Sequence, residues 1–589
     1  MTSNYLRIAL WTLLGLALLA NYNAWMHDYG LQPAPGTESA TKGPHAPGAD
    51  LGLRIPRPSS STAASPSASN PESSGSATPA QAASGAAVTN APAVGIAAPG
   101  SAATGAAAAS GTVHVRTDVL DLAISLKGGT LVRAELPKYP QVKGRPEPVR
   151  LENEDSPETL YLLESGLSGP DDAPRPDHLA TFTSSQSEYT LRTGARELRV
   201  PLTWTDDHGV SVQKVFTFRP GSYEIGLQQI VENHSDKPWQ AAQYSEIQRN
   251  DRPTKSSMFN FNAERYAFHG PALYDGMKYR KLNISSTDDQ HLSLDVRDGW
   301  LAAPQHHFVS AVVPPASVPY HYTLNVEGNT YALAAVGPSR TVAPGATESF
   351  DSKLFVGPKL QAQLATTAPE LVLVADYGKL TILAKPLFWL LGKVHALLHN
   401  WGLAIIVVTF LLKLLFYPLS EASGRSMAKM KALGPRIKSL QENYKDDREK
   451  AGRAMMELYK REKVNPVAGC LPIIIQIPVF LAFYWVLLES VEMRQAPFFG
   501  WINDLSSRDP LFILPAIMAG AMFVQYKLNP APPDPVQAKV MMIMPLAMSV
   551  MFAFFPAGLV LYWVTNTILS IAQQWNINRR IEASTKKKS

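Results

Sequence analysis

Lys413 stands inside an otherwise apolar run, Leu403 to Leu419 (LAIIVVTFLLKLLFYPL), and its type and setting favour a role in binding. A lysine within the hydrocarbon layer of a bilayer costs about 2.5–3.5 kcal/mol even on lenient insertion scales, so it normally faces protein or water. A fixed positive charge in such a place would attract acidic groups and offer hydrogen-bond donors to polar ones. The competing interpretation is that Lys413 extends its ammonium group to nearby lipid headgroups.

The last apolar run of the chain, GLVLYWVTNTILSIAQQW, carries polar side chains along one side. Its aromatic and polar residues recur every three or four positions, which places them on one stripe of a helix. Such a stripe can also hold membrane helices together through hydrogen bonds, and this alternative stays open. The stripe consists of Trp563, Asn566, Thr567, Ser570, Gln573 and Gln574.

Two further polar residues are expected near Lys413. Thr409 lies one turn before it on the same helix face. Gln476 is about as far from the cytoplasmic start of its own apolar run as Lys413 is from the end of Leu403–Leu419, roughly 8–9 Å at 1.5 Å per residue. The sequence therefore predicts a hydrophilic, positively charged groove in a helical bundle, lined by Lys413, Thr409, Gln476, Trp563, Asn566, Thr567 and Ser570.

A charged stretch, residues 420–465, separates the Lys413 run from the next apolar run. Two segments of helical character with a break near Asp446 predict a helical hairpin that projects from the membrane. Methionine side chains suit surfaces that accept partners of many shapes. We expect this hairpin to receive a client protein or its targeting partner through Met427, Met430, Met455 and Met456.

The rest of the sequence argues against covalent chemistry. The single cysteine, Cys470, excludes an intrachain disulfide, and no Cys/His cluster has the spacing of a zinc site. His395 and His399 stand four residues apart, as on an ordinary helix face. No nucleotide-binding, metalloprotease or nucleophile-elbow motif is present. We expect no catalytic residue, cofactor, metal or small-molecule substrate, and hence a protein that is not an enzyme.

The N-terminal region is an apolar segment followed by a low-complexity stretch. Residues 1–30 combine Arg7 with roughly 20 mostly apolar residues, enough to cross a bilayer. A cleaved signal peptide is the alternative, but no small-x-small cleavage site follows, and Trp25 resembles an interfacial anchor. Residues 31–111 are rich in Ala, Ser, Pro, Gly and Thr, a composition that predicts a disordered linker without a binding function.

Residues 112–365 have a different texture, with short alternating runs bounded by Gly, Pro, Asn and Asp. Many strands without long helices predict an antiparallel β-sandwich. Trp300, His306 and His307 could line a sugar site there. We favour the simpler interpretation that they are loop and strand-end residues, because no catalytic spacing organises them.

The C-terminal part is predicted to be a helical membrane region. Residues 371–400 mix polar and apolar positions around Pro386, which should break or kink a helix lying at the membrane surface. Residues 401–578 hold five apolar runs, which form a five-helix core and give six spans with the N-terminal anchor. The five runs are Leu403–Leu419, Leu471–Leu488, Leu511–Tyr526, Val540–Phe555 and Gly558–Trp575.

Basic residues predict the orientation of these spans. The stretch from Glu421 to Gly469 holds about a dozen lysines and arginines, and residues 579–589 form a basic tail. The positive-inside rule places both in the cytoplasm. With six spans the N-terminus is also cytoplasmic and the β-sandwich lies across the membrane, in the periplasm of a bacterium with two membranes.

Several long motifs resemble the YidC-type membrane protein insertases (the YidC/Oxa/Alb family). They are VTFLLKLLFYPLSEASGRSMAKMKALGPRIKSL, NPVAGCLPIIIQIPVFLAFYWVL, SVEMRQAPFFGWINDLSSRDPLFILP, FFPAGLVLYWVTNTILSIAQQW and, at the start of the β-sandwich, TDVLDLAISLKGGTLVRAELPKYP. The resemblance covers nearly everything except the linker. It implies the Gram-negative form of the family, with six spans and a periplasmic β-supersandwich in the inner membrane.

The resemblance also implies an activity and partners. Such proteins insert and fold inner-membrane proteins, alone or beside the Sec translocon. The expected partners are nascent membrane proteins, the Sec translocon, the lipid bilayer, and a ribosome met by the basic tail and the cytoplasmic loop. The family usually has arginine where this chain has Lys413, which keeps the charge but lacks the planar five-donor fork. It often has tyrosine where this chain has Trp563.

Two other classes of function compete with an insertase. A solute transporter or channel would be expected to show paired charges or broken helices at the midplane and often internal repeats, and we see none of these in the sequence. A membrane-anchored carbohydrate enzyme would need only one or two anchors. Depletion of the protein would separate the three, because membrane-protein integration, solute uptake or glycan processing would fail.

Overall fold

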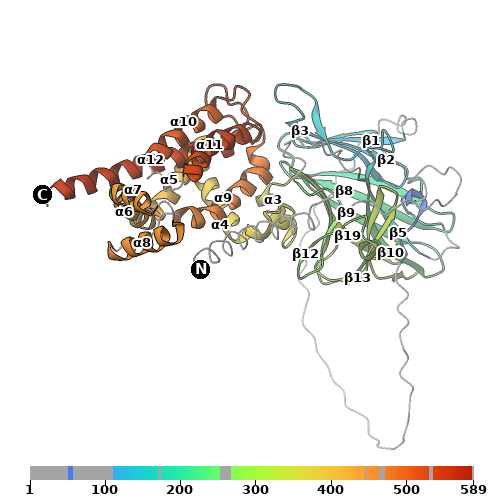
Figure 1. The fold of residues 1–589 in the computed structure, drawn as a ribbon. Helices are drawn as coiled ribbons and strands as arrows, with labels where there is room; N and C mark the ends of the chain where they lie inside the picture. Colours follow the sequence, from blue (N-terminus) through green and yellow to red (C-terminus); the bar gives the residue numbers. More distant parts are fainter. Residues whose placement is uncertain are drawn as a thin grey trace, which may run out of the picture.

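The computed structural model describes residues 51–57, 111–169, 174–251, 267–444, 447–462, 471–528 and 535–586. The predicted anchor, residues 1–30, lies outside these ranges. The described chain forms two parts, a β-sandwich and a helical region, which Figure 1 shows side by side. The predicted combination of an antiparallel sandwich with a helical region is confirmed at this level.

The sandwich consists of two sheets in which the named strands pair antiparallel, except that β1 and β6 are parallel. One sheet has the order β13-β16-β17-β10-β5-β3-β2-β1-β6, with β18 beside β10 and β4 beside β3; the other has the order β12-β11-β14-β15-β19-β9-β8-β7. The first sheet contains β1 (Thr112–Arg116), β2 (Asp121–Ser125), β3 (Thr130–Pro140), β4 (Pro148–Arg150), β5 (Tyr161–Ser168), β6 (Glu188–Thr190), β10 (Trp239–Asn250), β13 (Ser293–Val296), β16 (Tyr320–Glu327), β17 (Thr330–Val336) and β18 (Arg340–Val342). The second contains β7 (Leu198–Thr205), β8 (Val210–Phe218), β9 (Glu224–Asn233), β11 (Ala272–Tyr274), β12 (Tyr279–Lys281), β14 (Trp300–Gln305), β15 (Phe308–Val313) and β19 (Thr347–Pro358).

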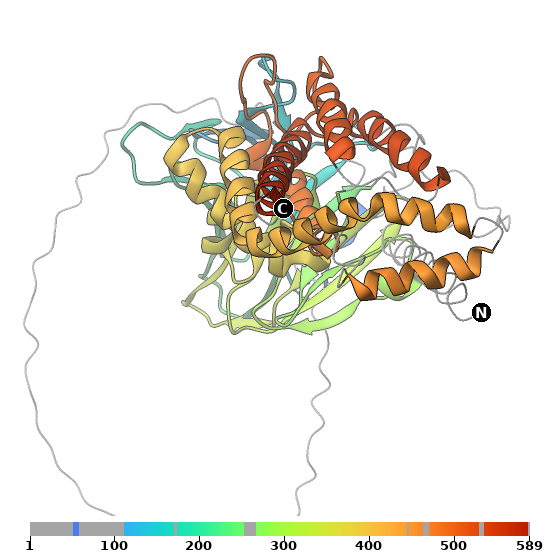
Figure 2. The ribbon, with the colours of Figure 1, turned by 60° about the vertical axis from the view of Figure 1, so that its left-hand side comes forward.

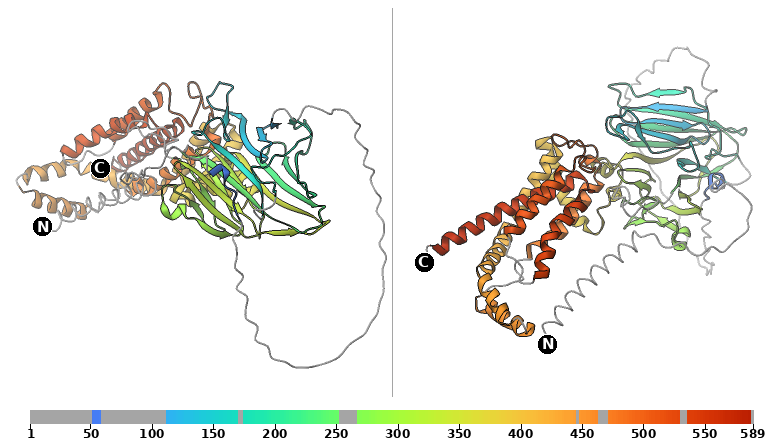
Figure 3. Two further views of the ribbon diagram at one scale, coloured as in Figure 1. Left: turned by 90° about the vertical axis from the view of Figure 1, so that its right-hand side faces the viewer. Right: turned by 45° about the horizontal axis from the view of Figure 1, so that its top comes forward.

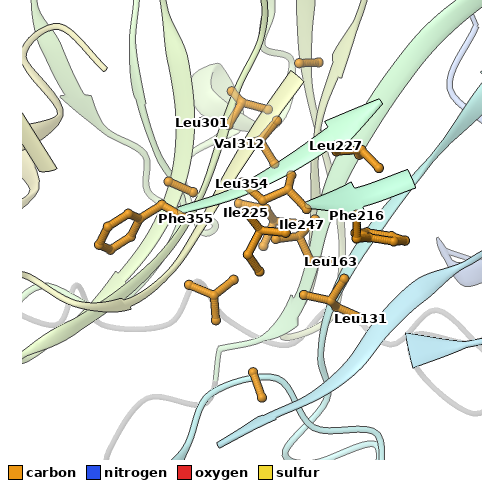
Figure 4. Close-up of a cluster of buried hydrophobic side chains, with 14 of the residues drawn as sticks. Leu131, Leu163, Phe216, Ile225, Leu227, Ile247, Leu301, Val312, Leu354 and Phe355 are labelled. Carbon is orange, nitrogen blue, oxygen red and sulfur yellow. The ribbon is translucent and has the colours of Figure 1, made fainter. Parts of the chain in front are cut away.

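The core of the sandwich lies between the sheets. Side chains of a strand point alternately to its two faces, and β9 shows this as strict alternation of buried and partly exposed residues over most of its length. Figure 4 shows Leu163 and Ile247 of the first sheet close to Ile225 and Leu354 of the second. This layer fixes the register of the strands, because a slip by one residue would turn the apolar set outward.

The helical region follows the sandwich after a short connection. It is built around α12, which packs against α5, α6, α9 and α10. Short helices in the sandwich and the connection are α2 (Thr287–Gln290), α3 (Gln361–Thr367), η3 (Leu371–Val374) and η4 (Gly378–Leu380). The helices of the region are α4 (Thr381–Leu398), α5 (Trp401–Leu415), α6 (Tyr417–Ala432), α7 (Gly434–Asn443), α8 (Arg448–Arg461), α9 (Leu471–Glu489), η6 (Val491–Met493), α10 (Ile513–Leu528), α11 (Pro535–Phe552) and α12 (Ala557–Lys586).

Two predicted helices are each divided in the structure, and the first break also contradicts the expectation of unbroken helices. The run Leu403–Leu419 is two helices that meet at Phe416 with a bend of 64°. Pro418 explains the break, since it has no N–H for the carbonyl four residues earlier and disfavours helical geometry in the residue before it. The first arm of the hairpin likewise divides before Pro435. By contrast, α4 continues through Pro386 without a break.

By length and composition, one described helix, α4, could cross a membrane alone, and a second candidate arises if the bent pair Trp401–Leu415 and Tyr417–Ser426 is one span. Three shorter apolar helices are Ile475–Glu489, Ile513–Leu528 and Met542–Phe552. The six-span arrangement and the surface position of residues 371–400 therefore stay predictions.

The sandwich and the helical region touch at the end of α9. The Lys359 ammonium lies 3.4 Å from a carboxylate oxygen of Glu489, and both side chains are almost fully buried. Next to this pair, His306 Nε2 donates to the carbonyl of Leu488 over 2.9 Å. At the opposite end of the helical region, farthest from the sandwich, lie α6 to α8 and the C-terminal end of α12 (Figures 1 and 2).

Candidate functional site

Five helices, α5, α6, α9, α10 and α12, surround a groove that is lined by both polar and apolar side chains. Its volume is about 300 Å³, and a smaller recess lined by Thr409 and Leu412 adjoins it. All seven residues predicted for the groove line one or both of these spaces. The sequence therefore identified the residues that meet, although whether they bind a client is a separate question.

Lys413 on α5 is the charged residue of this group. Its Nζ donates to Ser570 Oγ of α12 over 2.8 Å, and the Ser570 hydroxyl donates in turn to the carbonyl of Asn566 over 2.7 Å. Within the described residues, no carboxylate forms an ion pair with Lys413 and no other acceptor takes its remaining N–H groups. Because an ammonium group carries three donors, two are left for whatever enters the groove.

The other polar residues differ in what they offer. Gln476 Nε2 of α9 donates to Asn566 Oδ1, which joins α9 to α12 across the groove. Thr409 is buried, and its hydroxyl donates to the carbonyl of Ile405 over 2.6 Å. Thr567 is also buried. Thr409 therefore shapes the wall more than it presents a free hydroxyl.

Aromatic side chains form one wall. Trp563 packs edge-on against Phe480 of α9, with ring centroids 4.7 Å apart, and against Phe552 of α11 at 5.2 Å. This wall is an apolar surface beside the polar stripe. A segment that is part polar and part apolar would find both kinds of surface within one groove.

Some lining residues were missed from the sequence. Gln525 of α10 and Ser420 of α6 join the lining, and Gly424 lies where α6 crosses α12. A Cβ on Gly424 would come within 2.8 Å of the Ile577 side chain, so glycine lets the helices approach. Gln573, a member of the predicted stripe, has a buried Nε2 without an acceptor among the described residues. Gln525 could have been found as an amide in an otherwise apolar helix.

The predicted hairpin methionines are not equally available. Met430 and Met455 are half-buried and pack with Leu433, Ile437 and Leu458 inside the hairpin. Met455 lies on α8 and Met430 near the end of α6, one turn before Leu433, and both pack against the apolar cluster between α7 and α8. Met456 is 47% exposed, and the side chain of Met427 lies outside the described part.

The possible sugar-site residues of the sandwich are interior. Trp300 is fully buried, stacks on Tyr274, and donates its indole N–H to the carbonyl of Pro369 over 3.1 Å. His306 and His307 form the turn between β14 and β15 and stack on each other. Burial lowers the pKa of His306 to about 3 and that of His307 well below its usual value, so both rings are neutral. They are strand-end residues, and they support the contact with α9.

The described residues contain no group of three or more His, Cys, Asp or Glu side chains that could hold a metal ion. His395 instead stacks on Trp401 with ring centroids 3.8 Å apart.

Two family models match this chain, one for each of its two parts. The family model described as "YidC periplasmic domain" matches residues 112–390, and the one described as "60Kd inner membrane protein" matches residues 393–586. A membrane protein insertase YidC of Thioalkalivibrio sulfidiphilus (strain HL-EbGR7) is 48% identical over 81% of this chain and 86% of its own length. The chain belongs to the YidC family of membrane protein insertases.

Further relatives agree with this assignment. A YidC insertase of Nitrosococcus oceani is 46% identical over 80% of this chain and 86% of its own length. A crystal structure of an active YidC insertase with its first transmembrane domain resolved covers 79% of this chain and 92% of that chain, at 18% identity and a TM-score of 0.37. In this family the helical region is the inner-membrane part and the sandwich is the periplasmic domain.

Proposed function

We propose that this chain inserts membrane proteins into the bacterial inner membrane through the groove around Lys413. The relatives that share most of its length are named membrane protein insertases. The observation that carries the groove proposal is the lysine itself, which faces open space with one neutral hydrogen-bond partner and no carboxylate among the described residues.

The groove would act by lowering a desolvation cost. Moving a peptide group into hydrocarbon without a hydrogen bond costs roughly 2–7 kcal/mol, and a charged group costs more. Lys413 offers donors to such groups inside the membrane region, while Trp563 and Phe480 contact apolar ones. A client would enter with its polar segment against the stripe and leave with its apolar segment in lipid. No covalent step is needed.

The contact with Ser570 favours this interpretation over headgroup snorkelling. A lysine that reached for lipid headgroups would direct its ammonium away from the bundle. Here the ammonium lies 2.8 Å from a side chain on α12, the helix at the centre of the bundle. The alternative that the stripe only joins helices accounts for the Gln476–Asn566 contact but leaves the free donors of Lys413 unexplained.

Clients are proposed to arrive from the cytoplasm, where basic residues place the 420–465 hairpin and the C-terminal tail. The hairpin would receive the client or its targeting partner through Met456, and the basic tail would attract a ribosome electrostatically. Cooperation with the Sec translocon is part of the same proposal. Reporter fusions after Ala180 and Lys450 should give opposite compartment signals, and matching signals would overturn this topology.

Insertion by the purified protein is the direct test. Liposomes that contain the full-length chain should protect the acidic extramembrane segment of a short single-span client from added protease. A photocrosslinker at Ser570 should capture that client when it is stalled. Empty liposomes and liposomes with Lys413→Glu are the controls, and protection should fall at least tenfold in both. Equal protection in empty and protein-containing liposomes would refute the proposed function.

A further inference from the structure

The predicted linker contains a short segment that has its own place on the sandwich. Leu51–Leu53 forms one turn of 3-10 helix, η1, closed by a hydrogen bond from the Arg54 N–H to the Leu51 carbonyl over 3.2 Å. Leu51 is 1% exposed. Figure 3 shows this segment, in blue, against the β-sandwich in both views. The remainder of residues 31–110 lies outside the described ranges.

Apolar contacts seat this segment on the outer face of the first sheet. Ile55 packs against a small cluster formed by Ala242 and Tyr244 of β10 and Val336 of β17. Tyr244 pairs with Gly166 of β5 on one side and with Val336 of β17 on the other, so β10 is an interior strand of the sheet. The segment therefore lies on a face of the sheet and not along an open edge. A Cβ on Gly52 would lie 3.6 Å from the Gln248 side chain, which is ordinary contact distance.

A chain of hydrogen bonds joins the segment to β10 through His178. The Tyr244 hydroxyl accepts from the backbone N–H of His178 at 2.9 Å and lies 2.7 Å from His178 Nδ1. Burial raises the pKa of Tyr244 and lowers that of His178, so the hydroxyl keeps its proton and donates it to Nδ1 of a neutral ring. His178 Nε2 must then carry the other proton, and it donates to the carbonyl of Gly52 over 3.2 Å. The sheet thus presents one oriented donor to the segment.

Two carboxyl groups lie buried on the same face of β5 and β10. Tyr244, Glu246 and Gln248 alternate on the same face of β10, and the segment meets the first through Ile55 and His178. Glu246 lies between them, 3% exposed, and opposite Glu164 of β5, which is 5% exposed. One oxygen of each carboxyl has no hydrogen-bond partner among the described residues.

We propose that Leu51–Arg57 is a docking segment that fastens the N-terminal connection to the β10–β17 face of the periplasmic domain. Of the seven large aliphatic residues between positions 31 and 111, three fall at Leu51, Leu53 and Ile55, so the sequence concentrates apolar surface at this one place. The connection is thereby divided into two. Residues 31–50 alone span from the N-terminal apolar segment to the docking site, a reach of at most about 70 Å.

The division gives the two stretches different constraints. Residues 58–110 begin and end on the same domain, and the cost of closing such a loop rises only slowly with its length. Changes of length there should be tolerated. The composition of residues 51–57 should not be freely exchangeable, because each contact above depends on a named side chain or carbonyl.

Trypsin cleavage of the full-length protein in detergent tests the docking. The bond between Arg54 and Ile55 should be cleaved at least tenfold more slowly than a reference site introduced by Thr89→Arg in the same chain. The double variant Leu51→Ala/Ile55→Ala keeps the cleavage site and removes the apolar anchors, so its rate should approach the reference. The matched control Val94→Ala/Ile96→Ala should leave the protection intact.

Each outcome decides the proposal without reference to insertion activity. Equal cleavage at Arg54 and at the reference site in the otherwise unaltered chain would overturn it. Protection that persists in Leu51→Ala/Ile55→Ala would overturn the aliphatic anchoring. A third variant, His178→Gln, removes the Gly52 contact from the sheet side, and it should raise the cleavage rate at Arg54 severalfold while circular dichroism shows the sandwich folded.

Discussion

At the scale of single residues, Lys413 shows how a charge can be kept in the membrane region without a counter-ion. A buried carboxylate partner would neutralise it and leave nothing for a client. Ser570 accepts one hydrogen bond and remains neutral, so the ammonium is partly solvated by the protein and still attractive to acidic groups. At 4 Å and an effective dielectric of about 20, that attraction is worth roughly 4 kcal/mol, enough to bias entry without trapping the client.

Substitution of Lys413 should separate charge from structure. Lys413→Arg keeps the charge and should be tolerated. Lys413→Ala should slow the insertion of clients with acidic translocated segments about tenfold or more, and it should affect neutral clients less because the polar stripe of α12 remains. Insertion of both client types into vesicles, compared at equal protein levels, measures the difference. Equal insertion of acidic and neutral clients by Lys413→Ala would sink the attraction mechanism.

The residue types alone predicted which residues line the groove, but they did not predict where each polar atom points. A lysine and an amide in apolar runs are unusual enough to be found without a structure, and Lys413, Gln476 and Ser570 do meet. Thr409 satisfies its hydroxyl on its own helix, which spacing cannot reveal. Met430 and Met455 were expected on the surface of the hairpin, but which face α7 presents to α8 depends on the break before Pro435.

At the scale of elements, the close crossing of α6 and α12 at Gly424 sets one side of the groove. Gly424→Val should push the helices apart, since its Cβ would meet Ile577 at 2.8 Å. We expect insertion to fall severalfold and the crosslink from Ser570 to a client to weaken. Gly452→Val on α8 is the matched control, because a Cβ there meets nothing within 4 Å. If both variants insert equally well, the crossing does not control the groove.

A second element-scale prediction concerns the pH dependence of the sandwich. Glu152, just after β4, is fully buried, and one of its oxygens accepts from the Ser310 hydroxyl over 2.5 Å. Burial raises the pKa of Glu152 to about 7, against the opposing effects of Ser310 and Arg249. The folded state therefore holds a proton that the unfolded chain releases near its ordinary pKa of about 4.5. This stabilisation is complete below the unfolded pKa and is lost as pH rises toward 7 and above.

The contribution of Glu152 to the thermal stability of the sandwich should therefore be smaller at pH 8 than at pH 5, and thermal unfolding of the full chain and of Glu152→Gln at both pH values measures it. Glu152→Gln should raise the free energy of unfolding at pH 8 by up to about 3 kcal/mol, at 1.4 kcal/mol per pKa unit, and flatten the pH profile. Glu147→Gln, at an exposed position, should leave the profile unchanged. An unaltered slope in Glu152→Gln would show that this carboxyl is ionised in the folded protein.

At the scale of the whole molecule, the sandwich and the groove are connected through α9. That helix carries Gln476 at the groove and Glu489 at its other end, where Lys359 and His306 hold it. The sequence predicted both domains because strand alternation and apolar runs are local patterns. It could not predict this contact or the docked segment at Leu51, because both join residues far apart in the chain.

The groove residues all belong to the last 190 or so positions, so the sandwich should be dispensable for insertion provided that it is removed as a unit. A deletion of residues 115–320 would leave β17, β18 and β19 without β10, β9 and their other cut partners, and exposed apolar strands aggregate. That protein should accumulate poorly.

A deletion of residues 112–358 removes every strand that the structure describes and keeps Lys359, whose ammonium pairs with Glu489 at the end of α9. We expect this second protein to accumulate and to support growth after depletion of the full-length chain, with insertion reduced severalfold at most because the His306 contact with Leu488 is lost. Protein levels, growth and protease-protected client are measured together. Normal levels with no insertion would mean that the sandwich takes part in insertion, and the contact at α9 would be the first place to look for its effect.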